Sequence, residues 1–466
     1  MNGRTKLVCT IGPASEGRVV ELIGAGLDVA RINFSHGTRE TQRAMVAEVR
    51  AAADAAGVPV GVLVDLPGPK IRLGDLAGDT VTLEAGTTFD LRPGDESPGD
   101  ASGAHVSYDG LASDVRGGDR ILLADGAVEL RVVEIGDDVR TEVVRGGQIR
   151  PRAGVSVPSD RLSQPALTDA DRAAVPVALD LGADYVAQSF VRRAADIEAL
   201  RAALGADGPP IVAKIETRAA IDDFDAICRA ADAVMIARGD LGVELPYEEL
   251  PILQKQLVRR ALDHGVASIV ATQMLESMVS APRPTRAEAS DVANAIFDGA
   301  DAVMLSGETA IGAYPVLAAE AAARIALLCE EKGGEHMAAG ARPSAASDAD
   351  ALAYAAVALT QTDADISAIA CYTRSGRTAR ILSSLRPRVP ILAFSPDPAV
   401  VRRLSLLHGV QPRSCVPPPS SDERLNLMGW LVAEDSTLPR GTGVVLVAST
   451  AEPGTGPNLL EVRRVG

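Results

Sequence analysis

The chain has few cysteines and no long apolar run, and both shortages exclude classes of protein. Its five cysteines are an odd number scattered over 466 residues without a C-x-x-C pair, so neither a disulfide framework nor a zinc site is indicated. No stretch approaches the ~18 consecutive apolar residues that a membrane span needs, and the N-terminus has no features of a targeting segment. We therefore expect a cytoplasmic protein with no membrane partner.

Positive charge is also scarce, since 46 Lys and Arg face 62 Asp and Glu, a formal net charge of −16. Nucleic acids and anionic lipids would repel such a chain, so we expect no nucleic-acid partner, and an anionic ligand must be held by local cations. Several catalytic signatures are missing as well. There is no G-x-x-x-x-G-K-[ST] loop, no H-R-D loop with D-F-G, no H-E-x-x-H and no G-x-S-x-G.

What the sequence does contain is a repeated alternation of strand and helix patterns. The length exceeds the ~250 to 300 residues at which one hydrophobic core stops growing, which predicts several domains. Three early apolar runs (KLVCTIG, LDVARINF, VGVLVDL) and five later ones (ADYVAQSF, IVAKIE, ADAVMIARGD, ASIVATQ, ADAVMLSGE) are each followed by helical spacing. Eight such units predict a closed (β/α)8 barrel, formed by residues 1–69 and 154–330.

Two further regions have different patterns. Residues 70–153 alternate short strands with Gly-Asp turns and predict an inserted β-barrel-like lid domain above the active face of the barrel. Residues 331–349 are rich in Gly, Ala and Ser and are expected to be a connector. Residues 350–466 again alternate strands with helices, which indicates a C-terminal α/β domain with a mostly parallel sheet.

Polar side chains follow the second and fifth barrel strands. Side chains alternate across a strand, so Arg31, Asn33 and Ser35 in ARINFSH share one face, as do Lys214 and Glu216 in IVAKIE. Lys214 is one of only five lysines, and a buried lysine is rare unless paired. The first set is either a ligand site or a hydrogen-bonded core network, and the second either a ligand site or an internal ion pair.

Three later strands add candidates at the same rim. Asp240 follows the next strand beside Gly239, so Glu216 and Asp240 are expected at neighbouring strand ends, and two carboxylates suit Mg²⁺. Taken alone, an Asp after a Gly is more commonly a turn-forming residue than a metal ligand. Thr272 and Ser306 come at the ends of the last two strands. Their hydroxyls are candidates for binding a carboxylate or relaying a proton, and the alternative is a purely structural role.

The C-terminal domain carries the segment TRSGRT at a strand-to-helix junction. Backbone amides, hydroxyls and a helix N-terminus make a phosphate site, although a capped helix start with Ser375 as the cap is the alternative. The residues concerned are Thr373, Arg374, Ser375, Gly376, Arg377 and Thr378.

Together, TKLVCTIGPAS, VARINFSHG, IVAKIE, ARGDLGVE, ATQMLESM with PRPTRAEASDVANA, and DGADAVMLSGETAIGAYP resemble the pyruvate kinase family, in order and over essentially the whole chain. The resemblance implies phosphoryl transfer from phosphoenolpyruvate to ADP, giving pyruvate and ATP. It also implies that Glu216 and Asp240 hold Mg²⁺ or Mn²⁺, and that Lys214 and Arg31 neutralise the transferring phosphoryl group.

The same resemblance assigns the other rim residues. Gly239, Asp240 and Thr272 would hold the substrate carboxylate, and Thr272 and Ser306 would relay the proton to the enolate carbon. The residues facing the nucleotide phosphates would be Asn33, His36 and Arg72. The TRSGRT loop would bind a phosphorylated metabolite as an allosteric effector, and the family resemblance implies a homotetramer.

Two positions depart from the family pattern. In DLPGPKIR, Lys70 stands where potassium-dependent members have glutamate, and an ammonium there replaces a monovalent cation electrostatically, so we expect no requirement for K⁺. The residues of that cation region are Asn33, Ser35, Asp65, Leu66 and Lys70. Ala153 stands where the family usually has a nucleotide-facing lysine, with Arg152 one position earlier as a substitute.

Two rival functions remain open on the sequence alone. A metal-dependent aldolase or lyase acting on pyruvate enolates would use the same carboxylates, but has no evident need for Lys214 or the lid. A non-catalytic metabolite-sensing paralogue would keep the TRSGRT loop and lose productive ADP binding around Ala153.

Overall fold

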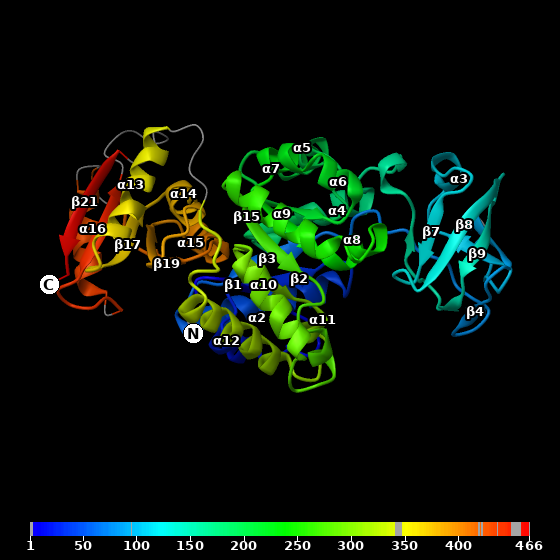
Figure 1. Ribbon diagram of the computed structural model, residues 1–466, viewed down its shortest axis with the longest axis horizontal. Helices are drawn as coiled ribbons and strands as arrows, with labels where there is room; N and C mark the ends of the chain where they lie inside the picture. The colour runs from blue at the N-terminus through cyan, green and yellow to red at the C-terminus, as the bar shows by residue number, and fades with distance from the viewer. Residues whose placement is uncertain are drawn as a thin grey trace.

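The computed structural model describes residues 3–94, 96–340, 347–417, 420, 423–435, 437–448 and 458–465. Three parts lie roughly in a row (Figure 1). The barrel is central, the inserted β domain lies at one side in cyan, and the C-terminal domain lies at the other in yellow to red.

Eight parallel strands close into a barrel in the order β1-β16-β15-β14-β13-β12-β3-β2, which confirms the expected fold. Most of these strands are buried along their whole length, because helices cover the outside while side chains fill the inside. The strands are β1 (Lys6–Thr10), β2 (Val29–Asn33), β3 (Gly61–Asp65), β12 (Tyr185–Gln188), β13 (Ile211–Ile215), β14 (Ala233–Ala237), β15 (Ala267–Ala271) and β16 (Ala302–Leu305).

The helices around the barrel start where the sequence provides caps. Thr38, Thr168 and Thr285 each accept a hydrogen bond from the third helical residue in a capping box. The helices are α1 (Val19–Ala25), α2 (Arg39–Ala56), α4 (Asp169–Asp180), α5 (Ala194–Leu204), α6 (Arg218–Asp222), α7 (Phe224–Ala230), α8 (Arg238–Glu244), α9 (Leu250–Asp263), α10 (Arg286–Phe297), α11 (Gly307–Ala310) and α12 (Pro315–Lys332), with short 3₁₀ turns η1 (Ser159–Arg161) and η2 (Glu276–Val279).

The inserted domain is a mostly antiparallel six-stranded sheet in the order β11-β7-β8-β9-β5-β6, with a separate pair β10-β4. Alternating buried residues such as Val128, Leu130 and Val132 form one side of its core. Its elements are β4 (Val81–Leu83), β5 (Thr88–Pro93), β6 (Gly103–Val106), α3 (Leu111–Asp114), β7 (Arg120–Leu123), β8 (Val128–Ile135), β9 (Val139–Arg145), β10 (Gly147–Ile149) and β11 (Val155–Ser156).

The C-terminal domain has a five-stranded sheet in the order β19-β18-β17-β20-β21. Four of the strands are parallel as expected, and β21 joins antiparallel to β20. The elements are α13 (Asp348–Thr362), β17 (Ile366–Tyr372), α14 (Arg377–Ser384), β18 (Ile391–Ser395), α15 (Pro398–Arg403), η3 (Leu404–Leu406), β19 (Val410–Ser414), α16 (Arg424–Glu434), β20 (Gly443–Ala448) and β21 (Leu459–Arg464).

The C-terminal domain closes the N-terminal end of the barrel. Arg386 binds Asp301, just before β16, with Nη2–Oδ2 at 2.9 Å. The Lys6 ammonium, at the start of β1, donates to the Val410 carbonyl at 2.8 Å. The carboxyl ends of the barrel strands lie at the opposite rim, which the described part of the C-terminal domain does not cover. None of the described helices is long and apolar enough to span a membrane.

Candidate active site

The inward-facing residues at the carboxyl ends of β2, β3 and β13 form a buried ionic cluster. Arg31 donates from Nε to Asp65 Oδ2 at 2.7 Å, and Lys214 Nζ lies 3.3 Å from Asp65 Oδ1 and 2.9 Å from Glu216 Oε1. Each of these four side chains is at most 11% exposed. Of the residues that the sequence placed at these two strand ends, the structure brings Arg31, Lys214 and Glu216 into one cluster with Asp65, while Asn33 and Ser35 lie outside it.

Burial and charge act against each other in this cluster. Burial opposes ionisation of Asp65, but Lys214 and Arg31 hold the pKa of its carboxyl below the usual value. Burial also opposes the charge on Lys214, yet the Asp65 and Glu216 carboxylates raise the pKa of its ammonium. Burial and the like charge of Asp240 raise the pKa of Glu216, although Lys214 opposes this shift. Lys214 is thus held protonated at the centre of the site.

Asp240 lies in the first turn of α8, after the neighbouring strand β14, as the sequence predicts. Its half-buried carboxylate has Oδ1 3.8 Å from Lys70 Nζ. Beside it, the Gly239 N–H donates to Thr272 Oγ1 at 2.7 Å. Thr272 adopts φ +69°, the left-handed region, directly after β15. Asp240, Gly239 and Thr272 therefore meet at one part of the rim.

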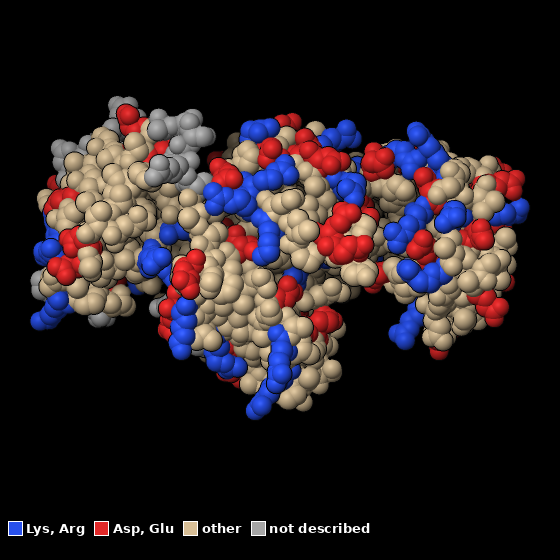
Figure 2. All heavy atoms as spheres, in the orientation of Figure 1, with Lys and Arg blue, Asp and Glu red and all other residues tan. Residues whose placement is uncertain are grey.

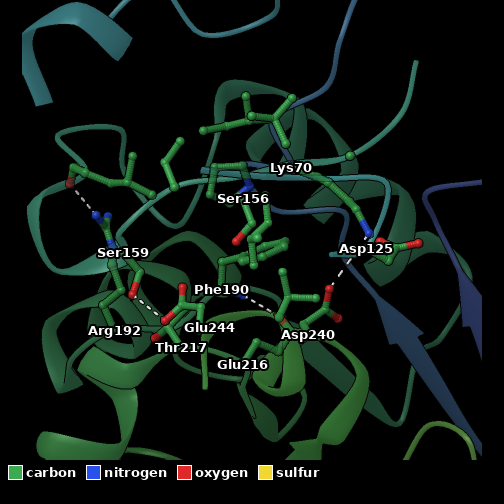
Figure 3. Close-up of a pocket in the computed structure, with 18 residues that line it drawn as sticks. Lys70, Asp125, Ser156, Ser159, Phe190, Arg192, Glu216, Thr217, Asp240 and Glu244 are labelled. Carbon is green, nitrogen blue, oxygen red and sulfur yellow. Dashed lines mark hydrogen bonds and ion pairs between the residues drawn. The ribbon is translucent and has the colours of Figure 1, made fainter. Parts of the chain in front are cut away.

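A pocket lies between this rim and the segments that enter and leave the inserted domain. It is lined among others by Lys70, Ser156, Phe190, Glu216 and Asp240. Figure 3 shows the Lys70 side chain reaching across the pocket toward Asp240. On the face shown in Figure 2, acidic and basic groups are interspersed over all three parts, without a large patch of one sign. An anionic ligand would therefore be attracted by the few cations at the pocket itself.

Two family models match the chain. One, for "Pyruvate kinase, barrel domain", covers residues 2–319, and the other, for "Pyruvate kinase, alpha/beta domain", covers residues 350–463. The chain belongs to the pyruvate kinase family. Its members are phosphotransferases, and the family reaction implies phosphoenolpyruvate and ADP as substrates and pyruvate and ATP as products.

Curated relatives agree with this membership. A "Pyruvate kinase" of Mycobacterium tuberculosis is 42% identical over 473 residues, covering 100% of this chain and 99% of the relative. A "Pyruvate kinase" of Bacillus licheniformis is 42% identical over 474 residues, covering 99% of this chain and 80% of the relative. A "Pyruvate kinase 2" of Synechocystis is 43% identical over 460 residues, covering 96% of this chain and 77% of the relative.

The other residues that the pyruvate kinase resemblance singles out are less tightly gathered. Ser306 caps α11, but its hydroxyl is buried and has no partner among the described residues. Ser35 and His36 are exposed beyond β2, and the Asn33 side-chain oxygen accepts the Ser35 N–H at 3.1 Å. Arg72 donates to the Arg152 carbonyl at 3.2 Å, on the inserted domain. Ser306, Asn33 and His36 thus belong to the barrel rim, whereas Arg72 contacts the inserted domain.

The structure corrects the surroundings expected for Lys70 and Arg152. The ammonium of Lys70 pairs with Asp240, whereas the partners of Asp65 are Arg31, Lys214 and Ser189. The reason is that Asp65 lies inside the barrel, while the chain has already left the rim at residue 70. Arg152 adopts φ +61°, and its guanidinium pairs with Asp75, with Nε 3.5 Å from Oδ1.

In the C-terminal domain, the TRSGRT segment forms the loop between β17 and α14. The helix cap is Gly376, at φ +85°, with no side-chain cap, so the alternative with Ser375 as the cap is wrong. The Gly376 N–H donates to Thr373 Oγ1 at 2.9 Å, and this bond folds the loop. Arg374, Ser375 and Arg377 are exposed.

Sequence reasoning missed three residues that hold the site together. Ser189 accepts a hydrogen bond from Lys214 Nζ at 2.6 Å, and the Phe190 N–H donates to Glu216 Oε2 at 2.7 Å. Glu308, fully buried, accepts from the Leu275 N–H at 3.0 Å and the Ser306 N–H at 2.7 Å. The SF pair that ends the ADYVAQSF run was the available signal for the first two.

Proposed function

We propose that this chain is a divalent-metal-dependent kinase that transfers the phosphoryl group of phosphoenolpyruvate to ADP at the rim formed by β2, β3, β13, β14 and β15. The observation that carries the proposal is Lys214. A protonated lysine, almost fully buried at the mouth of the barrel and flanked by two carboxylates, provides the fixed positive charge that phosphoryl transfer requires.

The donor set fits a divalent cation of the Mg²⁺ type. Glu216 directly follows β13, and Asp240 lies in the first turn of α8 after the neighbouring strand β14. Burial and the like charge of Asp240 both raise the pKa of Glu216. Among the described residues no third His, Cys, Asp or Glu completes a cage. Mg²⁺ takes one or two carboxylates and leaves its remaining positions to substrate oxygens and water. When bound, the cation supplies positive charge to the substrate carboxylate and phosphate.

The residues of the chain have separate roles in this reaction. Lys214 and Arg31 neutralise charge on the phosphoryl oxygens, and Asp65 fixes the orientation of both cations. The carboxylate of the substrate docks at Gly239 and Thr272. The hydroxyls of Thr272 and Ser306 pass a proton to the enolate carbon, giving pyruvate. Asn33, His36 and Arg72 face the nucleotide as the lid approaches.

We extend the proposal to the lid and to monovalent cations. Lys70 brings a fixed ammonium to Asp240 from the segment that enters the lid, and a fixed charge at this place removes the requirement for a bound K⁺. In this proposal the barrel consists of residues 1–69 and 154–330, and the lid consists of residues 70–153. Residues 331–349 are the connector, and residues 350–466 are the effector domain.

Regulation and assembly belong to the C-terminal domain in this proposal. The exposed arginines of the TRSGRT loop, beside a glycine-capped helix start, suit the phosphate of a metabolite effector. The assembly is a homotetramer in the cytoplasm. Light scattering of the purified protein tests the tetramer, and titration with phosphorylated metabolites at subsaturating phosphoenolpyruvate tests the effector.

The deciding experiment is pyruvate formation from phosphoenolpyruvate, ADP and Mg²⁺ without K⁺, followed through coupled lactate dehydrogenase. Rapid turnover supports both the reaction and the role of Lys70. No turnover after addition of K⁺ and sugar phosphates would contradict the proposal. Calorimetric titration of ADP with Mg²⁺ would then separate a sensor, which need not bind nucleotide, from an enolate lyase.

A further inference from the structure

Ser189 follows β12 and is 2% exposed. Its hydroxyl donates to the Leu66 carbonyl at 2.8 Å, which is closer than its other acceptor, Asp65 Oδ1 at 3.4 Å, and it accepts from Lys214 Nζ at 2.6 Å. A hydroxyl has one proton to donate, so the bond to Leu66 turns its lone pairs toward the ammonium. Lys214 is therefore held from a third direction, beside the bonds to Asp65 and Glu216.

Phe190, the next residue, holds the second functional group. Its N–H donates to Glu216 Oε2, which leaves Oε1 facing Lys214. Phe190 adopts φ +54°, a left-handed conformation that costs a non-glycine residue of order 1 kcal/mol or more. The surrounding contacts maintain this conformation, and it aims the N–H at the carboxylate.

The segment that leads into the lid packs on the same turn. A Cβ placed on Gly68 would lie 2.8 Å from Ser189 Cβ and 3.0 Å from Phe190 Cδ2. Only a glycine fits this approach, and Gly68 itself has φ +68°. The turn therefore contacts the lid connection on one side and the ionic cluster on the other.

We propose that the Ser189–Phe190 turn is a positioning element that sets Lys214 and Glu216 relative to each other and ties both to the start of the lid. Ser189 acts through Lys214, and Phe190 acts through Glu216. The inference rests on the proposed phosphoryl transfer and deepens it. It predicts that removing the Ser189 hydroxyl impairs the chemical step more than substrate capture.

The test compares Ser189→Ala with the wild-type enzyme and with Ser383→Ala. Ser383 is an equally buried serine whose hydroxyl donates to the His408 carbonyl in the C-terminal domain. We expect Ser189→Ala to lower kcat by about tenfold or more while KM for phosphoenolpyruvate changes less than about threefold. Ser383→Ala is expected to leave both within about twofold of wild type.

A second readout does not depend on turnover. Calorimetric binding of Mn²⁺ to the enzyme alone is expected to be unchanged in Ser189→Ala, because the hydrogen bonds described for the Ser189 hydroxyl go to Asp65, Leu66 and Lys214 and not to Glu216 or Asp240. Ser189→Cys, which keeps the volume and loses the strong acceptor, replaces the alanine variant if that protein does not fold. It is expected to show the same loss in kcat.

The possible results separate the inference from the proposed function. Inactive wild-type protein would overturn both. Active wild type with Ser189→Ala and Ser189→Cys at full kcat would overturn the positioning role alone. A rise in KM equal to the fall in kcat, or lost Mn²⁺ binding, would also overturn it, because general disorder of the site would then explain the effect.

Discussion

Lys70 Nζ lies 3.8 Å from Asp240 Oδ1, so the segment entering the inserted domain pairs with a proposed metal ligand on the barrel rim. The two side chains are 38% and 33% exposed, and solvent screens such a pair. Its importance is therefore one of charge placement in the pocket rather than of stability.

Charge reversal at this position tests the role of Lys70. We expect wild-type rates to be equal in Na⁺, K⁺ and tetramethylammonium. Lys70→Glu should lose about tenfold or more activity without K⁺, since it places a carboxylate beside Asp240, and should regain activity on titration with KCl. A large K⁺ stimulation of the wild type, or a variant indifferent to K⁺, would contradict this prediction. Rates in each salt at constant ionic strength provide the measurement.

Lys214→Met tests the central charge of the site. We expect kcat to fall by about 10²-fold or more, because the methionine side chain has similar length but cannot neutralise a phosphoryl group. The variant should fold but unfold at a lower temperature, since Asp65 and Glu216 lose a buried partner. The control is Lys255→Met, because Lys255 is an exposed lysine of α9 whose ammonium pairs with Asp298 at the end of α10. Near-normal rates in Lys214→Met would refute the assignment.

The alternation of apolar runs was sufficient to predict the barrel, because each run is a buried strand and each strand end faces the same rim. The pairing of Arg31 with Asp65 was not predictable, since side-chain reach depends on the register between strands. Ser189 and Phe190 were missed for the same reason: their partners lie 25 or more residues away. Strand β21 was missed because its side chains are only partly buried and its pattern includes Glu and Arg.

Gly68→Ala tests the close approach of the lid connection to the Ser189–Phe190 turn. Gly86→Ala is a matched control, because Gly86 also has positive φ but no described atom lies within 4 Å of the place that an alanine Cβ would take there. We expect the control to cost about 1 kcal/mol of unfolding free energy from backbone strain. Gly68→Ala should cost more and also lower kcat. Equal stability and activity in the two variants would show that the contact is not important.

Asp301→Asn tests how the C-terminal domain is fixed to the barrel. Asp301 is 4% exposed, binds the Arg386 guanidinium through both oxygens, and accepts the Ser268 N–H. Neutralising it leaves Arg386 buried without a countercharge, which should cost about 3 to 5 kcal/mol. Asp263→Asn, in the exposed pair with Arg259, should stay within about 0.5 kcal/mol of wild type. Chemical denaturation of both variants gives the comparison.

His408 should make the stability of this domain contact depend on pH. It is 3% exposed, and neither ring nitrogen has a partner among the described residues. Burial, together with the positive charges of Arg386, Arg4 and Lys6, lowers the pKa of His408 well below 6.5. Asp301, whose Oδ1 accepts the His408 backbone N–H at 3.3 Å, is an acidic group in contact with this residue.

The sign of the effect follows from proton uptake. Below pH 6.5 the unfolded chain protonates this histidine while the folded chain does not, so the stabilisation present above pH 6.5 is lost as the pH falls, by up to about 1.4 kcal/mol per pH unit. His408→Phe keeps a ring of similar shape and removes the titration, so its unfolding midpoint should fall less between pH 7 and pH 5.5. Denaturation of both proteins across this range tests the prediction, and parallel pH profiles would contradict it.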